Sequence, residues 1–360
     1  MKIMTQIKPY LKNLYRTRQG ENSRRNYLRL DMNESVSGLP EQFVKKTLNA
    51  IDPEFLAAYP EYEEFQKILA AHNNIDSANI CLSNGSDAAI KYIYDAYISP
   101  GDKVLLTDPT FAMYPVYCKM FNAQVVNVTY KQDLSFSTED FLDKISRDIK
   151  LAVVVNPNNP TGTAVEHDDL IAVIEKAANS NVLIIIDEAY FYFYPKSVME
   201  KVKLYKNLIV LRTFSKLCGM ASLRLGYAAA CPEIIENLRK VKPTYDVNSL
   251  AILFADRILK NTQIIQSLIQ EVNDGKKYLA NKLREFKIGY KEGYANFVLI
   301  KCCNRVDEIV KRLAGKNILV QGGFKQEFLK DYIRVTVGNV TIMERFWESF
   351  IVIWKKQMKT

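Results

Sequence analysis

Between residues 80 and 230, short apolar runs alternate with stretches of helical spacing. The helical stretches include residues 87–97 and 168–178. This alternation predicts right-handed βα units, and therefore an α/β fold whose mainly parallel central sheet is covered by helices on both faces. The runs expected to form strands are NICLS, KVLLT, QVVNV, LAVVV, VLIII, LIVLR and GYAAA.

The length of 360 residues favours two domains, because a single hydrophobic core rarely serves so long a chain. We expect residues 51–247 to form a large domain around the parallel sheet. Residues 30–50 and 248–360 are expected to form a smaller α+β domain, with a long amphipathic helix over 248–286. Residues 1–29 show no convincing periodicity and are interpreted as an N-terminal arm. The small domain should also contain strands at 296–301, 317–321 and 333–337, a helix near 306–314 and a terminal helix.

Composition and charge exclude several classes of protein. The formal charge of +9 includes lysines dispersed along expected helices, which is typical of solvated faces rather than of a nucleic-acid interface. The six cysteines show no CxxC spacing and only two histidines are present, so neither a metal site nor a disulfide framework is expected. No apolar run approaches the roughly 18 residues of a membrane span. We therefore expect a soluble cytoplasmic protein without nucleic-acid or membrane partners.

Three of the expected strands lead directly into polar motifs: NPNNPTG (156–162), DEAY (187–190) and TFSKLCGMASLRLGY (213–227). In an open parallel sheet, ligands bind at this carboxyl edge. Asp187 alone could be a helix cap, and a lone lysine is usually a surface group, but a buried Lys216 would have a lowered pKa and could attack an aldehyde. An amine, a carboxylate, hydrogen-bond donors and a phosphate cradle are what pyridoxal 5′-phosphate (PLP) requires.

With these motifs the chain resembles the PLP-dependent aminotransferases of fold type I, and among them the histidinol-phosphate aminotransferase group. The resemblance extends from LDMNES (30–35) to IRVTVG (333–338). It implies the type I fold and a homodimer. It also implies transfer of an amino group between an amino acid and a small oxo compound. By resemblance the amino acid is glutamate, and the second amino compound of the reaction is histidinol phosphate or one of similar size.

The resemblance assigns roles around the cofactor ring. Lys216 would hold the aldehyde and later move a proton, while Asp187 would keep the pyridine nitrogen protonated. Tyr190 and Asn159 match donors to the phenolate oxygen, although Asn-Pro and Thr-Gly also favour turns whatever the function. Phe111 stands where the family places an aromatic ring over the pyridine, and relatives that act on histidinol phosphate often have tyrosine there.

A phosphate cradle is implied where SNGSDAAI (83–90) passes from strand to helix, because helix N-termini present free N–H groups. Asp87 is interpreted as the cap of this helix, and its backbone amide, rather than its carboxylate, is expected to contact the phosphate. Tyr59 matches a tyrosine that reaches the cofactor phosphate of the neighbouring subunit, with an ordinary core or surface tyrosine as the alternative. The other residues expected in the cradle are Gly85, Ser86, Thr213, Ser215 and Arg224.

Arg334 matches the arginine that grips the substrate α-carboxylate, and a structural Asp or Glu is the alternative partner. Asn33 and Asn248 match positions near the substrate pocket, which Asn159 also borders. Gln321 departs from the family, because members that use histidinol phosphate usually carry arginine there. If another cation recognises a distal phosphate, the candidates are Lys325, Arg16 and the pair Arg24–Arg25.

Two rivals remain open at this point. A PLP-dependent decarboxylase or lyase of a phosphorylated amino acid would share every cofactor residue named above. A PLP-binding regulator would need a DNA-binding extension, and the first 30 residues are too short for one.

Overall fold

The computed structural model describes residues 7–12, 14 and 24–356. Arg16, one candidate for phosphate recognition, therefore lies outside the described residues. Within the described ranges, no helix has the length and apolar content needed to cross a bilayer.

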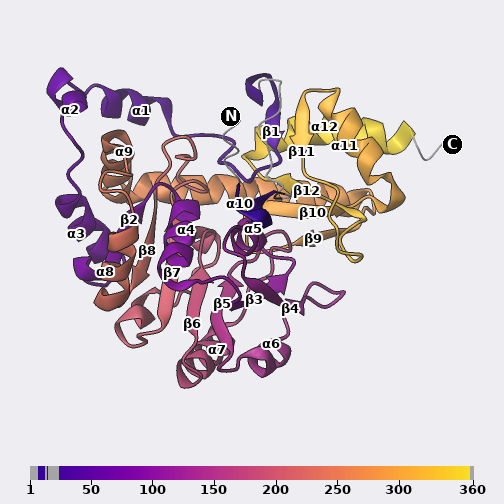
Figure 1. Cartoon of the computed structure of the whole chain (residues 1–360). Helices are drawn as coiled ribbons and strands as arrows, with labels where there is room; N and C mark the ends of the chain where they lie inside the picture. Colours follow the sequence, from indigo (N-terminus) through magenta and orange to yellow (C-terminus); the bar gives the residue numbers. More distant parts are fainter. Residues whose placement is uncertain (1–6, 13, 15–23, 357–360) are drawn as a thin grey trace, which may run out of the picture.

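A seven-stranded sheet with the strand order β2-β8-β7-β6-β5-β3-β4 forms the centre of the larger part of the molecule (Figure 1). Neighbouring strands run parallel except for β8, which is antiparallel to β2 and β7. The prediction of a mainly parallel sheet is thus confirmed, and every expected run forms a strand. The strands are β2 (Ile80–Ser83), β3 (Lys103–Asp108), β4 (Gln124–Thr129), β5 (Ile149–Val155), β6 (Leu183–Asp187), β7 (Leu208–Thr213) and β8 (Gly226–Ala230).

Helices pack on both faces of this sheet, because alternate residues of its strands enter different hydrophobic clusters. Ile185 of β6 belongs to one cluster, while Ile184 and Ile186 belong to the other. The first face is covered by α4 (Ser86–Tyr97), α5 (Met113–Met120) and α8 (Pro232–Val241). The second is covered by α3 (Glu63–His72), α6 (Thr138–Lys144), α7 (His167–Asn179) and α9 (Ser249–Leu259).

A third cluster lies around two small sheets. In one, β10 (Phe297–Lys301) pairs with β9 (Tyr290–Glu292) and β12 (Tyr332–Thr336) in antiparallel fashion. In the other, β1 (Leu28–Leu30) runs parallel to β11 (Ile318–Val320). The helices that pack here are α10 (Thr262–Glu285), α11 (Val306–Ala314) and α12 (Val340–Lys356). In Figure 1, α10 runs above the large sheet from α9 towards these strands.

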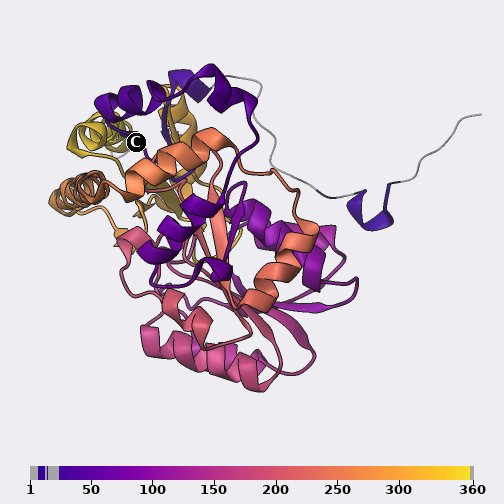
Figure 2. The same cartoon turned by 90° about the vertical axis from the view of Figure 1, so that its left-hand side faces the viewer.

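The helix predicted over 248–286 is in fact two helices. It is interrupted between Leu259 and Thr262, where Asn261 leaves the helical conformation with φ −125° and ψ 74°. Asparagine favours such positions because its short side chain competes with the helical backbone hydrogen bonds. Figure 2 shows the two helices as separate orange segments.

The boundary between the two domains stays a prediction. Phe254 of α9 packs in the cluster of the large sheet, as does Phe43 of α1 (Glu41–Leu48), which precedes the short α2 (Pro53–Ala57). Both residues come from ranges that the sequence pattern assigned to the small domain. Long-range packing of this kind has no signature in local periodicity.

Candidate active site

The carboxyl ends of β5, β6 and β7 lie side by side at one edge of the large sheet. The register pairs Val155 of β5 with Asp187, and Asp187 with Leu211 of β7. The 156–162 loop, Asp187 and the turn that carries Lys216 therefore start at the same level. This is the edge at which ligands bind in open α/β sheets.

Lys216 is partly accessible, and its Nζ donates a hydrogen bond to the Met32 carbonyl at 3.2 Å. The same Nζ lies 5.9 Å from the centroid of the Tyr190 ring. Desolvation, together with the positive charge of the nearby Arg334, lowers the pKa of Lys216 to about 8. A lysine in this range is a usable nucleophile near neutral pH.

Asp187 is a buried carboxylate, only 2% exposed. Its Oδ2 accepts a hydrogen bond from the Tyr114 hydroxyl at 2.7 Å, and its Oδ1 accepts one from the Ala189 amide at 3.1 Å. Burial raises the pKa of Asp187 to about 6, although both hydrogen bonds oppose the shift. A protonated ring nitrogen beside this carboxylate would restore its charged form.

Tyr114 is a partner of the site that the sequence pattern did not identify. It lies three residues after Phe111 in DPTFAMYP, so the two rings are neighbours, with centroids 6.2 Å apart in an edge-on arrangement. That spacing was a usable signal, since residues three positions apart share one side of a helical turn. Phe111 itself is half-buried.

Tyr190 and Asn159 each accept a hydrogen bond from another side chain, so the donor group of each remains free. The Tyr190 hydroxyl accepts from Asn33 Nδ2 at 2.8 Å, so its own proton can be donated elsewhere. Asn159 accepts from Arg334 Nη1 through its Oδ1, which leaves its amide nitrogen as a donor. Asn33 is buried and held in turn by Thr336.

Arg334 is 8% exposed, and burial lowers its pKa. Its Nη2 donates to the Asp31 carbonyl at 2.7 Å, while its Nε is buried without a hydrogen-bond partner. In the described part of the chain, no carboxylate forms an ion pair with Arg334, so the structural alternative for its partner is not supported. A backbone bridge pairs Arg334 with Gln321, whose exposed side chain bonds only to the Gly322 carbonyl among the described residues.

A second group of residues converges where β2 meets α4. Gly85 has φ +77°, and a Cβ added there would lie 2.5 Å from Arg224 Nη2. Gly226 lies opposite both Ser83 and Thr213, and a Cβ on it would lie 2.3 Å from the Ser86 nitrogen. Both glycines are thus needed to bring the turn, the guanidinium and the strand end together.

Two hydroxyl groups complete this cradle. Thr213 Oγ1 donates to Ser215 Oγ at 3.0 Å, and Arg224 Nη1 lies 3.4 Å from the same Ser215 oxygen. The amides of Ser86 and Asp87 belong to the first turn of α4, where the N–H groups have no partner within the helix. Backbone N–H groups, hydroxyls and a guanidinium together suit a phosphate.

One sequence interpretation is wrong. Asp87 is not the helix cap, because α4 begins at Ser86 with Gly85 as its N-cap; the Asp87 carboxylate instead accepts a hydrogen bond from Tyr117 at 3.0 Å. Asn248 caps α9 by accepting a hydrogen bond from the Ala251 amide at 2.8 Å, and its place near the substrate pocket stays a prediction. The interpretation of Asp87 failed because its partner Tyr117 comes from another segment of the chain.

Tyr59 lies apart from these groups. It is 74% exposed and stacks on Tyr245 with ring centroids 4.3 Å apart. It lines a groove of about 1420 Å³ formed largely by α2, α3 and α9. The described contacts of a single chain do not connect it to Lys216.

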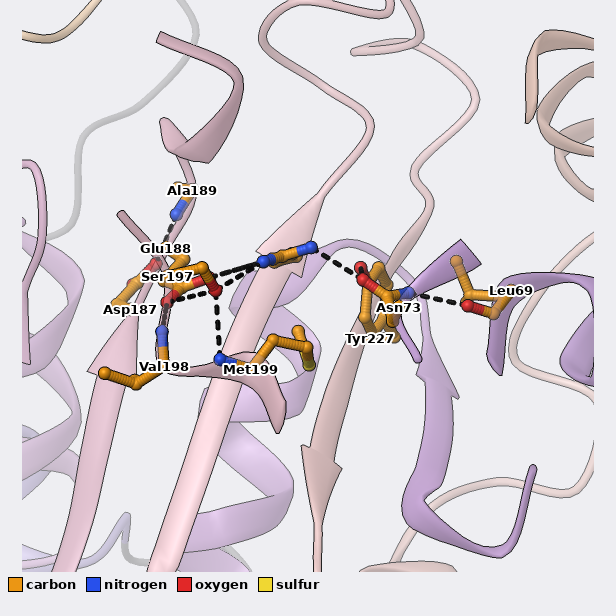
Figure 3. Close-up of polar contacts among 10 residues, drawn as sticks. Leu69, Asn73, Asp187, Glu188, Ala189, Ser197, Val198, Met199 and Tyr227 are labelled. Atoms are coloured by element: carbon orange, nitrogen blue, oxygen red, sulfur yellow. Dashed lines mark hydrogen bonds and ion pairs between the residues drawn. The ribbon is translucent and has the colours of Figure 1, made fainter. Parts of the chain in front are cut away.

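A buried polar network behind the site was also missed. Arg212 of β7 donates to Glu188 at 2.9 Å, to Ser197 at 2.7 Å and to Asn73 at 2.6 Å, and Figure 3 shows Glu188 and Ser197 on one side and Asn73 on the other. Glu188 directly follows Asp187, so the network fixes the ends of both β6 and β7. The signal was an arginine inside an otherwise apolar strand, which is seldom buried without a partner.

These residues fit PLP. The cradle that a Cβ at Gly85 would obstruct suits its phosphate, the buried Asp187 suits its ring nitrogen, and Lys216 suits its aldehyde. The buried Nε of Arg334 has no hydrogen-bond partner, while its Nη1 donates to Asn159 beside these groups.

Comparison with known families agrees with this chemistry. The family model "Aminotransferase class I and II" matches residues 25–350. The chain therefore belongs to the class I and II aminotransferases, and the prediction of a PLP-dependent aminotransferase with the type I fold is confirmed.

Individual relatives are more specific. The chain is 35% identical to a histidinol-phosphate aminotransferase of Caldanaerobacter subterraneus, over 86% of this chain and 88% of the relative. It is 34% identical to one of Clostridium novyi, over 87% of each chain. The solved histidinol-phosphate aminotransferase of Sinorhizobium meliloti in complex with pyridoxal 5′-phosphate has a TM-score of 0.89, 19% identity and 99% coverage of both chains.

Proposed function

We propose that this enzyme moves an amino group between L-glutamate and histidinol phosphate or a compound of similar size. The curated relatives at 34–35% identity are named for that substrate, which favours amino transfer over the lyase alternative. The observation that carries the proposal is Arg334, a buried guanidinium with an unpartnered Nε. Such a group offers a charge-assisted fork to the α-carboxylate of an amino acid.

When bound, PLP draws electrons away from the substrate Cα, so that a proton can leave that carbon. In our proposal Lys216 holds the cofactor aldehyde and, once released as a free amine, carries this proton between Cα and C4′. Asp187 holds a proton at the ring nitrogen. Tyr190 and Asn159 use their free donors on the phenolate oxygen, and Phe111 packs against the ring.

The cradle around Gly85 and Arg224 is our proposed site for the cofactor phosphate. Ser86 and Asp87 contribute backbone N–H groups, and Asp87 keeps its carboxylate on Tyr117 rather than on the ligand. The remaining contributors are Thr213 and Ser215. On the substrate side, Asn33 orients Tyr190 and Gln321 borders Arg334.

Replacement of Arg334 tests the substrate assignment. Loss of one partner from a buried charge pair costs roughly 3–5 kcal/mol, and about 1.4 kcal/mol corresponds to tenfold. Arg334→Ala should therefore lower kcat/KM for glutamate by two to three orders of magnitude or more. Arg334→Lys keeps the charge but loses the fork, so its kcat/KM for glutamate should lie between the values of wild type and of Arg334→Ala. Wild-type kcat/KM in Arg334→Ala would rule out the carboxylate role.

Gln321 tests recognition of the distal phosphate. A neutral amide cannot form the charge-assisted fork that arginine offers, so Gln321→Arg should raise kcat/KM for phosphorylated substrates over their unphosphorylated analogues. Among other cations, Arg24 already pairs with Asp31 at 2.6 Å, which leaves Arg25 and Lys325 as the described alternatives. High wild-type efficiency with histidinol phosphate and no gain in Gln321→Arg would show that this position does not set specificity.

The assembly and the compartment are also proposals. The exposed rings of Tyr59 and Tyr245 are available to a second subunit, so we propose a homodimer in which Tyr59 reaches the neighbouring site. All six cysteines are free thiols, four of them buried, which supports a reducing cytoplasm.

A further inference from the structure

The segment 242–248, which joins α8 to α9, contacts both halves of the phosphate cradle. Asp246 Oδ2 accepts a hydrogen bond from the Asn84 amide at 3.3 Å. Asn248 Nδ2 donates to the Leu223 carbonyl at 2.9 Å. Asn84 precedes Gly85 and Leu223 precedes Arg224, so one short segment holds the backbone beside each.

The Asp246 carboxylate is the centre of these contacts. Lys242 Nζ lies 2.8 Å from Asp246 Oδ1, and the two side chains are only 10% and 5% exposed, respectively. The Tyr92 hydroxyl donates to Asp246 Oδ2 at 2.7 Å. Lys242 also donates to the Leu82 carbonyl at 3.2 Å. A single ion pair thus connects the end of β2, the following turn and the middle of α4.

The charges of this cluster suit a place close to a phosphate. Hydrogen bonds to an ionised carboxylate are stronger than those to a neutral acceptor, so Asp246 can hold a turn in one conformation. Lys242 neutralises the carboxylate, so the charge of Arg224 on the other side of the turn remains available to an anion. The N–H groups of the first turn of α4 are useful only while the turn keeps its position.

We propose that Asp246 is a positioning residue for the cofactor phosphate: its carboxylate, paired with Lys242, fixes the turn at 84–86 and α4 so that their N–H groups face the phosphate. The inference rests on the proposed function, because it takes PLP as the ligand. The proposed role concerns binding of the phosphate and not of the ring, because Asp246 contacts the cradle but neither Lys216 nor Asp187.

The test compares PLP with pyridoxal, which has the same ring and aldehyde but no phosphate. The full-length chain, freed of cofactor, is titrated with each compound, and binding is followed by absorption. In Asp246→Asn the Kd for PLP should rise about tenfold or more, the scale of a lost hydrogen bond to a charged group. The Kd for pyridoxal should stay within about threefold, because the interactions of the ring are unchanged.

Asp256→Asn is the matched control, since Asp256 pairs with Lys260 at 2.8 Å on α9 and has no described contact with the cradle. The Kd values of Asp256→Asn for PLP and for pyridoxal should equal those of wild type. If Asp246→Asn does not fold, Tyr92→Phe removes one hydrogen bond, keeps the ion pair, and should weaken PLP selectively. The proposal would be overturned if, in the variant that folds, the Kd values for PLP and pyridoxal rise equally, or if neither of them changes. A wild-type chain that does not bind PLP at all would instead overturn the proposed function.

Discussion

At the scale of single residues, Lys216 determines the pH at which the enzyme can take up its cofactor. Burial and the neighbouring Arg334 lower the pKa of Lys216 to about 8. Because only the neutral amine attacks an aldehyde, the rate of PLP attachment should rise with pH and level off above about 8, rather than near the usual 10.5. Stopped-flow absorption measures this rate, and borohydride reduction with peptide mapping should place the pyridoxyl group on Lys216.

Arg334→Gln supplies the control for this pH dependence. Removal of the positive charge should move the midpoint upward, because Arg334 disfavours the protonated lysine. A midpoint near 10 in the wild type, or a label on another lysine, would contradict the assignment of Lys216.

Candidate site residues were easiest to propose from the sequence where they lie in continuous motifs. Lys216, Asp187 and Arg334 could be identified because each follows or interrupts an apolar run. Asp246 could not, since its partner Asn84 lies 162 residues away in the chain, and Tyr114, whose partner Asp187 lies 73 residues away, had only its spacing from Phe111 as a local signal. The wrong role given to Asp87 has a similar cause, since Tyr117 lies 30 residues away in the chain.

At the scale of helices and strands, α10 is held close to the loop that follows β12. A Cβ on Gly275 would lie 1.9 Å from the Gly338 carbonyl oxygen. Helix propensity alone favours Gly→Ala by about 1 kcal/mol, but overpacking against rigid backbone typically costs about 1–3 kcal/mol. We expect Gly275→Ala to lower the free energy of unfolding and, because Gly338 follows the strand that carries Arg334, to weaken glutamate binding.

Gly315→Ala is a suitable control for Gly275→Ala. Gly315 ends α11 with φ −64°, and its nearest contact would be 3.4 Å from the added Cβ. Denaturant unfolding should show a change within about 0.5 kcal/mol for this variant. Stabilisation by Gly275→Ala would show that α10 can move away from the loop at little cost.

Strands were easier to predict than helix boundaries. The strands β5, β6 and β7 are rich in β-branched residues and almost wholly buried, so composition and burial act together. The interruption at Asn261 was missed because apolar periodicity continues on both sides of it. The two helices differ in their packing, because α9 lies in the cluster of the large sheet, whereas α10 starts in that cluster with Ile265 and Leu268 and continues into the cluster of the small sheets with Leu279 and Leu283.

At the scale of the whole molecule, the proposed dimer makes Tyr59 part of the neighbouring site. A mixture of the inactive Lys216→Ala chain with a Tyr59→Ala chain of strongly reduced activity should regain activity, because each mixed dimer contains one site with both wild-type residues. Activity is measured after subunit exchange has been verified, with each variant alone as the control. If exchanged mixtures stay inactive, Tyr59 acts within its own chain or has no role in the site.

The central claim is that this chain transfers amino groups through PLP. The most direct measurement adds L-glutamate to the purified enzyme with its cofactor and follows the cofactor absorption together with the products. We predict conversion of the cofactor to its aminated form with one equivalent of 2-oxoglutarate, and reversal by the oxo compound that corresponds to histidinol phosphate. An unchanged spectrum with glutamate, together with release of carbon dioxide from a phosphorylated amino acid, would contradict the account.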